Sequence, residues 1–313
     1  MDGKQARKTG SSSPLGLLFD HGCDAINSIF GSANWIIAIG LSLGCEPDVW
    51  MCWILILGPM SLFYVTTWEE YYTGKLSLPI INGPNEGMVL GALTSLTTCI
   101  YGVSYWQDTT WYERVLKPYL IPILPYTIRN MIPVNYVLRN CDIQVLMATI
   151  GFIQETVSKT TLVVYNCGLK STFELLPFWT LLVCTFLIGL CRADILIDMP
   201  RTTLHLISGL FVEMSTHLML DHITSETFQP LRWVLLPLVI LTVLTVSGYI
   251  SESSPQTDSF LTIYASSLWS YLLLKLTIII HEACTVLNIW CFDIMTPRQG
   301  RSLSSVVSDQ KHK

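Results

Sequence analysis

Charged residues are scarce in this sequence. Asp, Glu, Lys and Arg make up 13% of its 313 residues, whereas a typical soluble domain contains about 25%. Hydrophobic residues account for 51%. So few charges cannot cover the surface of a soluble protein of this length. The composition therefore predicts an integral membrane protein with much of its surface in lipid.

Three further features are missing. An excess of basic residues is absent, since the net charge is −5, and this argues against nucleic acid as a partner. No CxxC pair occurs among the ten cysteines, most of which lie in apolar runs and are expected to be small buried residues. The polar N-terminal residues do not resemble a cleavable signal peptide, so the first hydrophobic helix is expected to act as the targeting signal.

The sequence contains instead a series of apolar segments, each long enough to cross a bilayer at about 20 residues per crossing. In lipid such segments form helices, because their backbone groups must be satisfied internally. The sequence thus predicts an all-α, polytopic membrane bundle with about eight transmembrane helices. They are expected at residues 14–44, 50–72, 86–106, 142–165, 173–191, 203–220, 232–250 and 261–282.

These segments are expected to form one membrane domain over residues 1–295, followed by a disordered cytosolic tail over residues 296–313. Residues 107–141 contain four prolines among aromatic and apolar residues, which is typical of a segment lying at the membrane interface. With the N-terminus in the cytosol, ten Lys and Arg residues fall on the cytosolic side and six on the other, which supports that orientation.

A polar pattern lies at the start of the chain. It reads DG-xx-AR-(eight residues)-G-xxx-D-xxx-D and comprises Asp2, Gly3, Ala6, Arg7, Gly16, Asp20 and Asp24. The last two carboxylates are four residues apart on a predicted helix and share one face. In a membrane helix two like charges repel and are costly to desolvate. A divalent cation relieves both costs, and carboxylate oxygens suit Mg²⁺, Mn²⁺ or Ca²⁺.

The other residues of the pattern complete a phosphate site. Asp2 is placed to reach the same ions, and Lys4 and Arg7 offer positive charge for a diphosphate. The small residues of the pattern let a ligand approach the backbone closely. This set predicts metal-assisted phosphoryl transfer at the cytosolic membrane boundary. The alternative, two acids that merely decorate a helix end, leaves the other five positions unexplained.

The pattern matches the signature of the CDP-alcohol phosphatidyltransferase family at each position. The flanking words GKQARKTGSSSPLG and LFDHGCDAINS resemble its eukaryotic cholinephosphotransferase and ethanolaminephosphotransferase branch. The stretches TWEEYYTGKLSLPIINGPNEG, residues 67–87, and HEACTVLNIWCF, residues 281–292, resemble the same branch. The resemblance runs nearly end to end, and it is looser after Trp106.

The resemblance implies a transferase of phospholipid biosynthesis. Such an enzyme passes phosphocholine or phosphoethanolamine from CDP-choline or CDP-ethanolamine to diacylglycerol and releases CMP. It implies a two-metal site with Mg²⁺ or Mn²⁺, in which Asp2 and Asp20 are ligands and Asp24 completes the site or acts as a base. The residues that would line the CDP pocket are Gly3, Ala6, Arg7 and Gly16. The expected location is the endoplasmic reticulum or Golgi, with the active site facing the cytosol.

His21 lies beside Asp20 and one turn before Asp24. Its imidazole is placed to take the hydroxyl proton of the lipid substrate, and histidine is the side chain that most often acts as a general base. A structural histidine that bonds Asp24 or the backbone is an equal alternative at this point.

Two departures from the family pattern stand out. The family usually has another metal-binding Asp three residues before the DG pair, with two helices before it, whereas this sequence begins at Met1. The family also tends to have Glu where this chain has Leu17. The first departure leads us to expect an N-terminally truncated form, and an inactive or regulatory short isoform is the first alternative function. A transporter is the second, but it gives no reason for the spacing of the pattern.

Polar residues also occur in later segments. Trp68, Glu69 and Glu70 lie where the second helix returns to the cytosol, and they are candidates for the ammonium headgroup through charge and cation–π contact. An interfacial aromatic belt with solvated acids is the favoured alternative. Glu155 and Lys159, four residues apart, are expected to form a structural ion pair. The sequence does not distinguish choline from ethanolamine, and a homodimer is one arrangement that it allows.

Overall fold

The computed structural model describes residue 8 and residues 13–44, 48–74, 87–123, 137–250 and 255–291. Its elements are α2 (Pro14–Ala38), α3 (Asp48–Thr73), α4 (Met88–Tyr101), α5 (Ser104–Gln107), η2 (Tyr112–Leu120), η3 (Ile121–Ile123), α7 (Asn140–Cys167), η4 (Leu169–Leu175), α8 (Leu176–Cys191), α9 (Ala193–Asp198), α10 (Pro200–Thr224), η5 (Trp233–Leu235), α11 (Leu236–Val246) and α12 (Pro255–Val286). All are helical, which confirms the predicted all-α class.

Each of the eight predicted segments contains one of these helices, but eight crossings are not confirmed. Among the described residues, three helical stretches are long and apolar enough to cross a membrane: Asp48–Thr73, Leu169–Cys191 and Gln256–Val286. The helix Met88–Tyr101 and the segment after it make a fourth if the pair, bent by 98°, is one broken span. α2, α7 and α10 have the required length, at 25, 28 and 25 residues, but carry charged side chains that lower their hydropathy.

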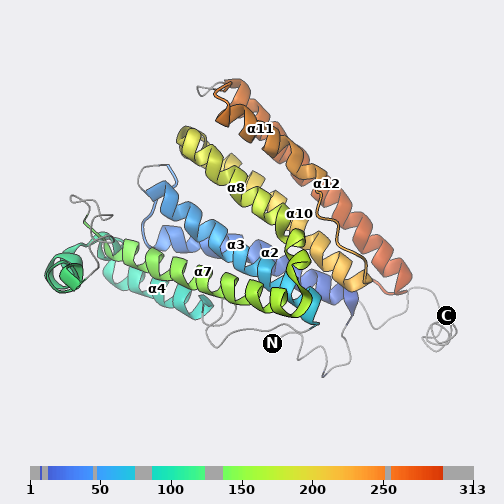
Figure 1. Ribbon diagram of the computed structural model, residues 1–313, viewed down its shortest axis with the longest axis horizontal. Coiled ribbons are helices and arrows are strands. Elements are labelled where there is room, and N and C mark those ends of the chain that lie inside the picture. The colour runs from blue at the N-terminus through green and yellow to red at the C-terminus, as the bar shows by residue number, and fades with distance from the viewer. Residues whose placement is uncertain are drawn as a thin grey trace.

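Contacts near the helix ends fix the directions of the first helices. The first half of α2 meets the last turns of α3 through His21 and Glu70, so these two helices are antiparallel. Arg139, just before α7, binds Asp48 at the start of α3 with an N–O distance of 2.7 Å, so α7 runs parallel to α3. Figure 1 shows α2, α3, α4 and α7 grouped together, while α8, α10, α11 and α12 fan away from them.

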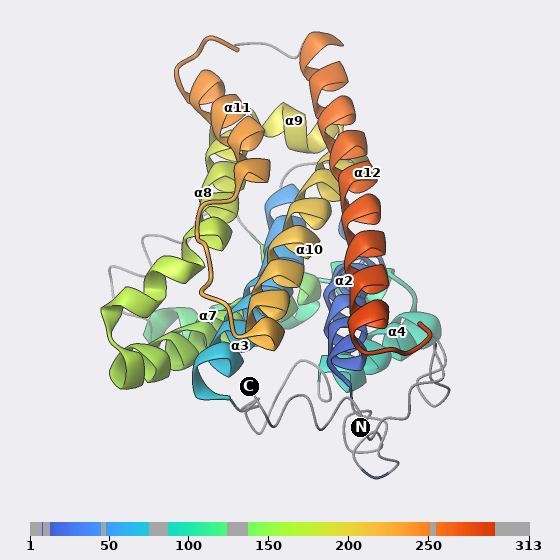
Figure 2. The same ribbon diagram turned by 90° about the vertical axis from the view of Figure 1, so that its right-hand side faces the viewer.

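α10 forms the centre of the bundle. It packs against α12, α2 and α3, and Figure 2 shows it between α8 and α11 on one side and α12 on the other. Every residue from Leu206 to Thr216 is buried. Gly209 lets α12 approach, because a Cβ there would lie 2.9 Å from the Leu268 side chain. A helix buried on all faces has no surface for solvated charges, so any ionic side chain on it needs a partner inside the protein.

α3 and α7 make the most extensive helix pair. Gly58 permits this contact, because a Cβ at that position would lie 2.2 Å from a ring carbon of Phe152. At the start of the pair, Arg139 also binds Asp142 (2.8 Å) and donates to Gln107 (2.9 Å), so one guanidinium joins α3, α5 and α7. This clamp holds the sharp bend that follows α4.

Candidate functional site

The site begins with the first turn of α2, which the sequence caps efficiently. Ser13 is extended, and its hydroxyl oxygen accepts a hydrogen bond from the Gly16 amide at 3.0 Å. Pro14 follows in the first helical turn, where its missing N–H costs nothing. A Cβ on Gly16 would lie 3.2 Å from the Ser13 hydroxyl, so glycine leaves room for the cap. The sequence thus fixes where the helix that carries Asp20 and Asp24 starts.

Asp20 and Asp24 lie on one exposed face of α2. The opposite face packs into the protein through apolar residues such as Leu18, Ala25 and Ile29. Two exposed carboxylates one turn apart supply hard oxygen donors, which fit one side of a Mg²⁺ or Mn²⁺ site. Within the described ranges, no group of three or more His, Cys, Asp or Glu side chains could hold a metal ion.

The remaining residues of the pattern lie outside the described residues. These are Asp2, Gly3, Lys4, Ala6 and Arg7. The third predicted metal ligand and the predicted diphosphate contacts therefore stay predictions. The structure brings Gly16, Asp20, His21 and Asp24 onto the same stretch of α2.

His21 points into the protein, toward α3. Its Nε2 atom lies 4.0 Å from Oε2 of Glu70, and its ring meets Phe63 edge-on with a centroid distance of 6.3 Å. The sequence analysis named Glu70 only in connection with the headgroup. No local signal relates the two residues, because they are far apart in the sequence and meet only through the packing of α2 on α3.

Trp68 and Glu69, the other headgroup candidates, are buried near the end of α3, with exposures of 0% and 1%. The Trp68 indole donates to the backbone oxygen of Ser171 at 3.2 Å. Glu69 accepts from Lys159, which also lies 3.5 Å from Glu155. The predicted Glu155–Lys159 pair is thus present with a third member. Glu69 is not the solvated acid of the alternative interpretation, and its headgroup role stays a prediction.

A second buried ionic cluster is centred on α10, at residues for which the sequence predicted no specific role. Glu213 is 1% exposed, and its Oε1 atom receives Arg232 at 2.7 Å, Lys275 at 3.0 Å and His217 at 3.5 Å. Lys275 also lies over the Tyr271 ring, 5.6 Å from its centroid. These residues come from α10, α12 and the segment before η5. The cluster therefore joins three parts of the chain that no sequence spacing connects.

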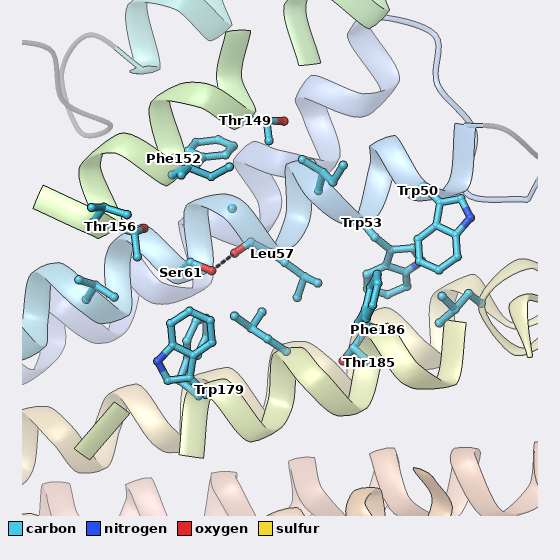
Figure 3. A pocket seen from close by; sticks show the side chains of 18 residues that line it. Trp50, Trp53, Leu57, Ser61, Thr149, Phe152, Thr156, Trp179, Thr185 and Phe186 are labelled. Carbon is cyan, nitrogen blue, oxygen red and sulfur yellow. Dashed lines mark hydrogen bonds between the residues drawn. The ribbon is translucent and has the colours of Figure 1, made fainter. Parts of the chain in front are cut away.

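A cavity of about 420 Å³ lies between α3, α7 and α8. Figure 3 shows aromatic rings around it, including Trp50, Phe152, Trp179 and Phe186. Its polar lining consists of indole and hydroxyl groups, among them the hydroxyl of Ser61, which donates to the Leu57 carbonyl at 2.7 Å. A lining without a titratable side chain cannot supply an acid, a base or a metal ligand. The titratable candidates for the chemistry therefore lie on α2, outside this cavity.

Comparison with known proteins indicates the family of the chain. No family model matches the chain. The chain is 31% identical over 310 residues to choline/ethanolaminephosphotransferase 2 of Arabidopsis thaliana. The aligned region covers 94% of this chain and 74% of the relative. The chain belongs to the choline/ethanolaminephosphotransferase family. This agrees with the resemblance found in the sequence.

Two further relatives place this family membership in context. An uncharacterized CDP-alcohol phosphatidyltransferase class-I family protein of Dictyostelium discoideum is 29% identical, covering 94% of this chain and 75% of the relative. Ethanolaminephosphotransferase 1 of mouse is 28% identical over 256 residues, covering 79% of this chain and 58% of the relative. The similarity extends well beyond the α2 pattern, so the family assignment does not rest on that pattern alone.

Proposed function

We propose that this protein transfers phosphocholine or phosphoethanolamine from a CDP-alcohol to diacylglycerol and releases CMP, as a step of phospholipid synthesis. The observation that carries the proposal is the exposed carboxylate face of α2, within a pattern shared with the CDP-alcohol phosphatidyltransferases. Relatives named as phosphotransferases, with similarity over most of the chain, support the same activity.

The proposed site holds two divalent cations, Mg²⁺ or Mn²⁺, between Asp2, Asp20 and Asp24. When bound, such ions neutralise the bridging phosphates and stabilise the leaving CMP. Asp20 and Asp24 contribute exposed carboxylates one helical turn apart. The small residues Gly3, Ala6 and Gly16 let the nucleotide approach the protein backbone. Lys4 and Arg7 pair with the diphosphate of the nucleotide.

The lipid hydroxyl must lose its proton as it attacks phosphorus. His21 is the base that we propose, since its imidazole lies one position after Asp20 and its Nδ1 atom is buried without a hydrogen-bond partner in the described part of the protein. The oxygen–phosphorus bond to diacylglycerol forms while the bond to CMP breaks. The proton passes to the imidazole and the electron pair leaves with CMP.

We further propose that all eight helical segments cross the membrane, with the N-terminus and the active site in the cytosol. The helix directions support this topology, since α2 and α3 run in opposite directions and α7 runs parallel to α3. Glu155 and Lys159 of α7 pair with each other, and Glu213 of α10 pairs with Arg232, which lowers the cost of these charges in lipid. The endoplasmic reticulum or Golgi is the proposed membrane, residues 1–295 the proposed catalytic domain, and residues 296–313 a proposed disordered cytosolic tail.

The test is a CMP-release assay on the purified protein in mixed micelles that contain diacylglycerol. CDP-choline and CDP-ethanolamine are supplied separately, and their kcat/KM values give the headgroup preference. We expect CMP to appear only when both substrates are present. EDTA should abolish the reaction and excess Mg²⁺ or Mn²⁺ should restore it. Absence of CMP with either donor, in protein shown to be folded, would overturn the proposed function.

A further inference from the structure

We propose that Glu70 is a positioning residue for His21, holding the imidazole from α3 so that the opposite ring nitrogen faces the lipid hydroxyl. This inference rests on the proposed function, because it assigns a partner to the base of that reaction. It concerns two side chains that come from different helices and that no motif connects.

The first observation is the geometry of the pair. His21 Nε2 lies 4.0 Å from Glu70 Oε2, and the two side chains are 11% and 16% exposed. This separation exceeds the 2.7–3.2 Å of a formed hydrogen bond. Catalytic hydrogen bonds are often long before substrate binds and tighten in the complex. A small approach of α2 to α3 is therefore enough to form the bond.

The second observation is that one buried polar atom of each side chain has no hydrogen-bond partner among the described residues. Glu70 Oε2 and His21 Nδ1 are buried atoms with no hydrogen-bond partner in the described part of the structure. A buried acceptor without a donor is destabilising, and more so when it carries a charge. A bond from His21 Nε2–H to Glu70 would satisfy the carboxylate. It would leave Nδ1 with a free lone pair, which is what a base requires.

The contrast with the neighbouring acid supports this assignment. Glu69 is buried against Lys159, a cation that neutralises it. Among the described residues, Glu70 forms no ion pair with Lys or Arg, and the basic side chain that it meets is that of His21. The adjacent acids Glu69 and Glu70 therefore face different partners. Glu70, which faces His21, is not part of a structural ion pair with Lys or Arg among the described residues.

The imidazole is also fixed from a second side. The Phe63 ring meets it edge-on, and Phe63 in turn meets Phe211 of α10 with centroids 5.9 Å apart. Apolar rings on one side and a carboxylate on the other restrict rotation of the imidazole. A hydrogen bond to the carboxylate would select the tautomer protonated on Nε2, by the same logic as a carboxylate that orients a catalytic histidine in a hydrolase triad.

A double-mutant cycle separates positioning from general support of the fold. Variants Glu70→Gln, His21→Ala and the pair are compared by CMP release, with Glu155→Gln as a control acid that is 21% exposed. We expect Glu70→Gln to lower kcat about 10–100-fold, on the scale of other orienting partners, with the KM for the CDP-alcohol unchanged. In the His21→Ala background it should cost nothing further. Equal losses in both backgrounds would overturn the proposal.

A carboxylate introduced on α2 offers a second test, because it could replace the lost carboxylate of Glu70 on α3. Leu17 lies one turn before His21, so a carboxylate at that position could reach the same imidazole. Leu17→Glu should restore part of the lost kcat in the Glu70→Gln variant, whereas Leu17→Gln should not. Equal behaviour of the two second-site variants would contradict an electrostatic positioning role.

A readout without turnover separates this inference from the proposed function. Nitrogen NMR of ¹⁵N-histidine protein, with His21 assigned by its loss in His21→Ala, reports which ring nitrogen carries the proton. We expect the Nε2–H form in the native chain and a mixture of tautomers in Glu70→Gln. Unchanged His21 signals in Glu70→Gln would overturn the positioning role even in an active enzyme. Absence of CMP release from the native chain would instead reject the proposed function and leave the NMR test in force.

Discussion

Acidic side chains occur in two settings in this bundle. On α2, Asp20 and Asp24 are exposed, on the face opposite the packed side of the helix. On α3 and α10, Glu69 and Glu213 are each 1% exposed and bind cations from other helices. An acid that serves the fold brings its counter-charge with it, because an isolated charge in a membrane is expensive. The α2 acids face outward, where a ligand can supply the counter-charge.

Asp20→Asn tests the functional side of this contrast and should have the largest effect. The change removes one oxygen charge from the proposed metal site and leaves the size of the side chain intact. We expect kcat for CMP release to fall about 1,000-fold or more, the scale on which phosphoryl transfer depends on single charge-stabilising groups. The melting temperature without metal should not change, because the side chain is exposed. A fall in melting temperature with retained activity would show that Asp20 serves the fold and not the reaction.

Glu213→Gln tests the structural side. The change leaves Arg232 and Lys275 buried together without the carboxylate that they share. Breaking a buried pair on one side costs about 3–5 kcal/mol, and thermal unfolding in detergent micelles measures this loss. The exposed acid Glu226 offers a control, since Glu226→Gln should change stability by no more than about 0.5 kcal/mol. If both variants unfold alike, the cluster does not stabilise the bundle.

Lys159→Met tests whether Glu69 has a structural or a functional role, because Glu69 is both the ion-pair partner of Lys159 and a candidate for binding the headgroup. Leaving Glu69 buried without a cation should cost about 3 kcal/mol. Adding Glu69→Leu should recover most of that loss, since an apolar pair can replace a buried ion pair.

The KM for CDP-choline and CDP-ethanolamine in the Lys159→Met/Glu69→Leu variant then separates the two roles of Glu69. We expect KM to stay near that of the native protein. A rise confined to this kinetic parameter, in a protein of restored stability, would place Glu69 at the headgroup. The folded fraction is monitored in parallel, so that loss of protein is not mistaken for loss of binding.

The same contrast explains how far the sequence could predict the structure. Local patterns correctly predicted a helix in each of the eight expected segments, because apolar length and helix signals act within one segment. The i, i+4 spacing correctly predicted the Glu155–Lys159 pair. It could not predict that Glu69 joins them, or that Glu213 meets Arg232 and Lys275, because those partners depend on how the helices pack. Hydropathy alone does not confirm eight crossings, because it scores each segment by itself. It therefore treats charged residues such as Glu155 of α7 and Glu213 of α10 as unpaired, although they have partners in the structure.

The contact between His21 and Glu70 shows the same limit at the candidate site. The α2 pattern located the candidate catalytic helix, and the position of Ser13 before Pro14 marks where that helix begins. The facing residue could not be named, because it is set by the way α2 packs on α3. Sequence spacing therefore predicts the residues of one helix face, and the tertiary structure is needed for the groups that orient them.

Ser13→Ala should give the smallest effect and links the fold to the site. The change removes the hydroxyl that accepts from the Gly16 amide at 3.0 Å and should cost about 1 kcal/mol. Because the cap lies two turns before Asp20, fraying of the first turn should reach the site only weakly. We expect kcat to fall less than about threefold, with faster amide hydrogen exchange confined to the start of α2. Ser13→Asp retains an acceptor and should behave like the native protein. A large loss of activity in Ser13→Ala with normal exchange would instead place this hydroxyl in the chemistry.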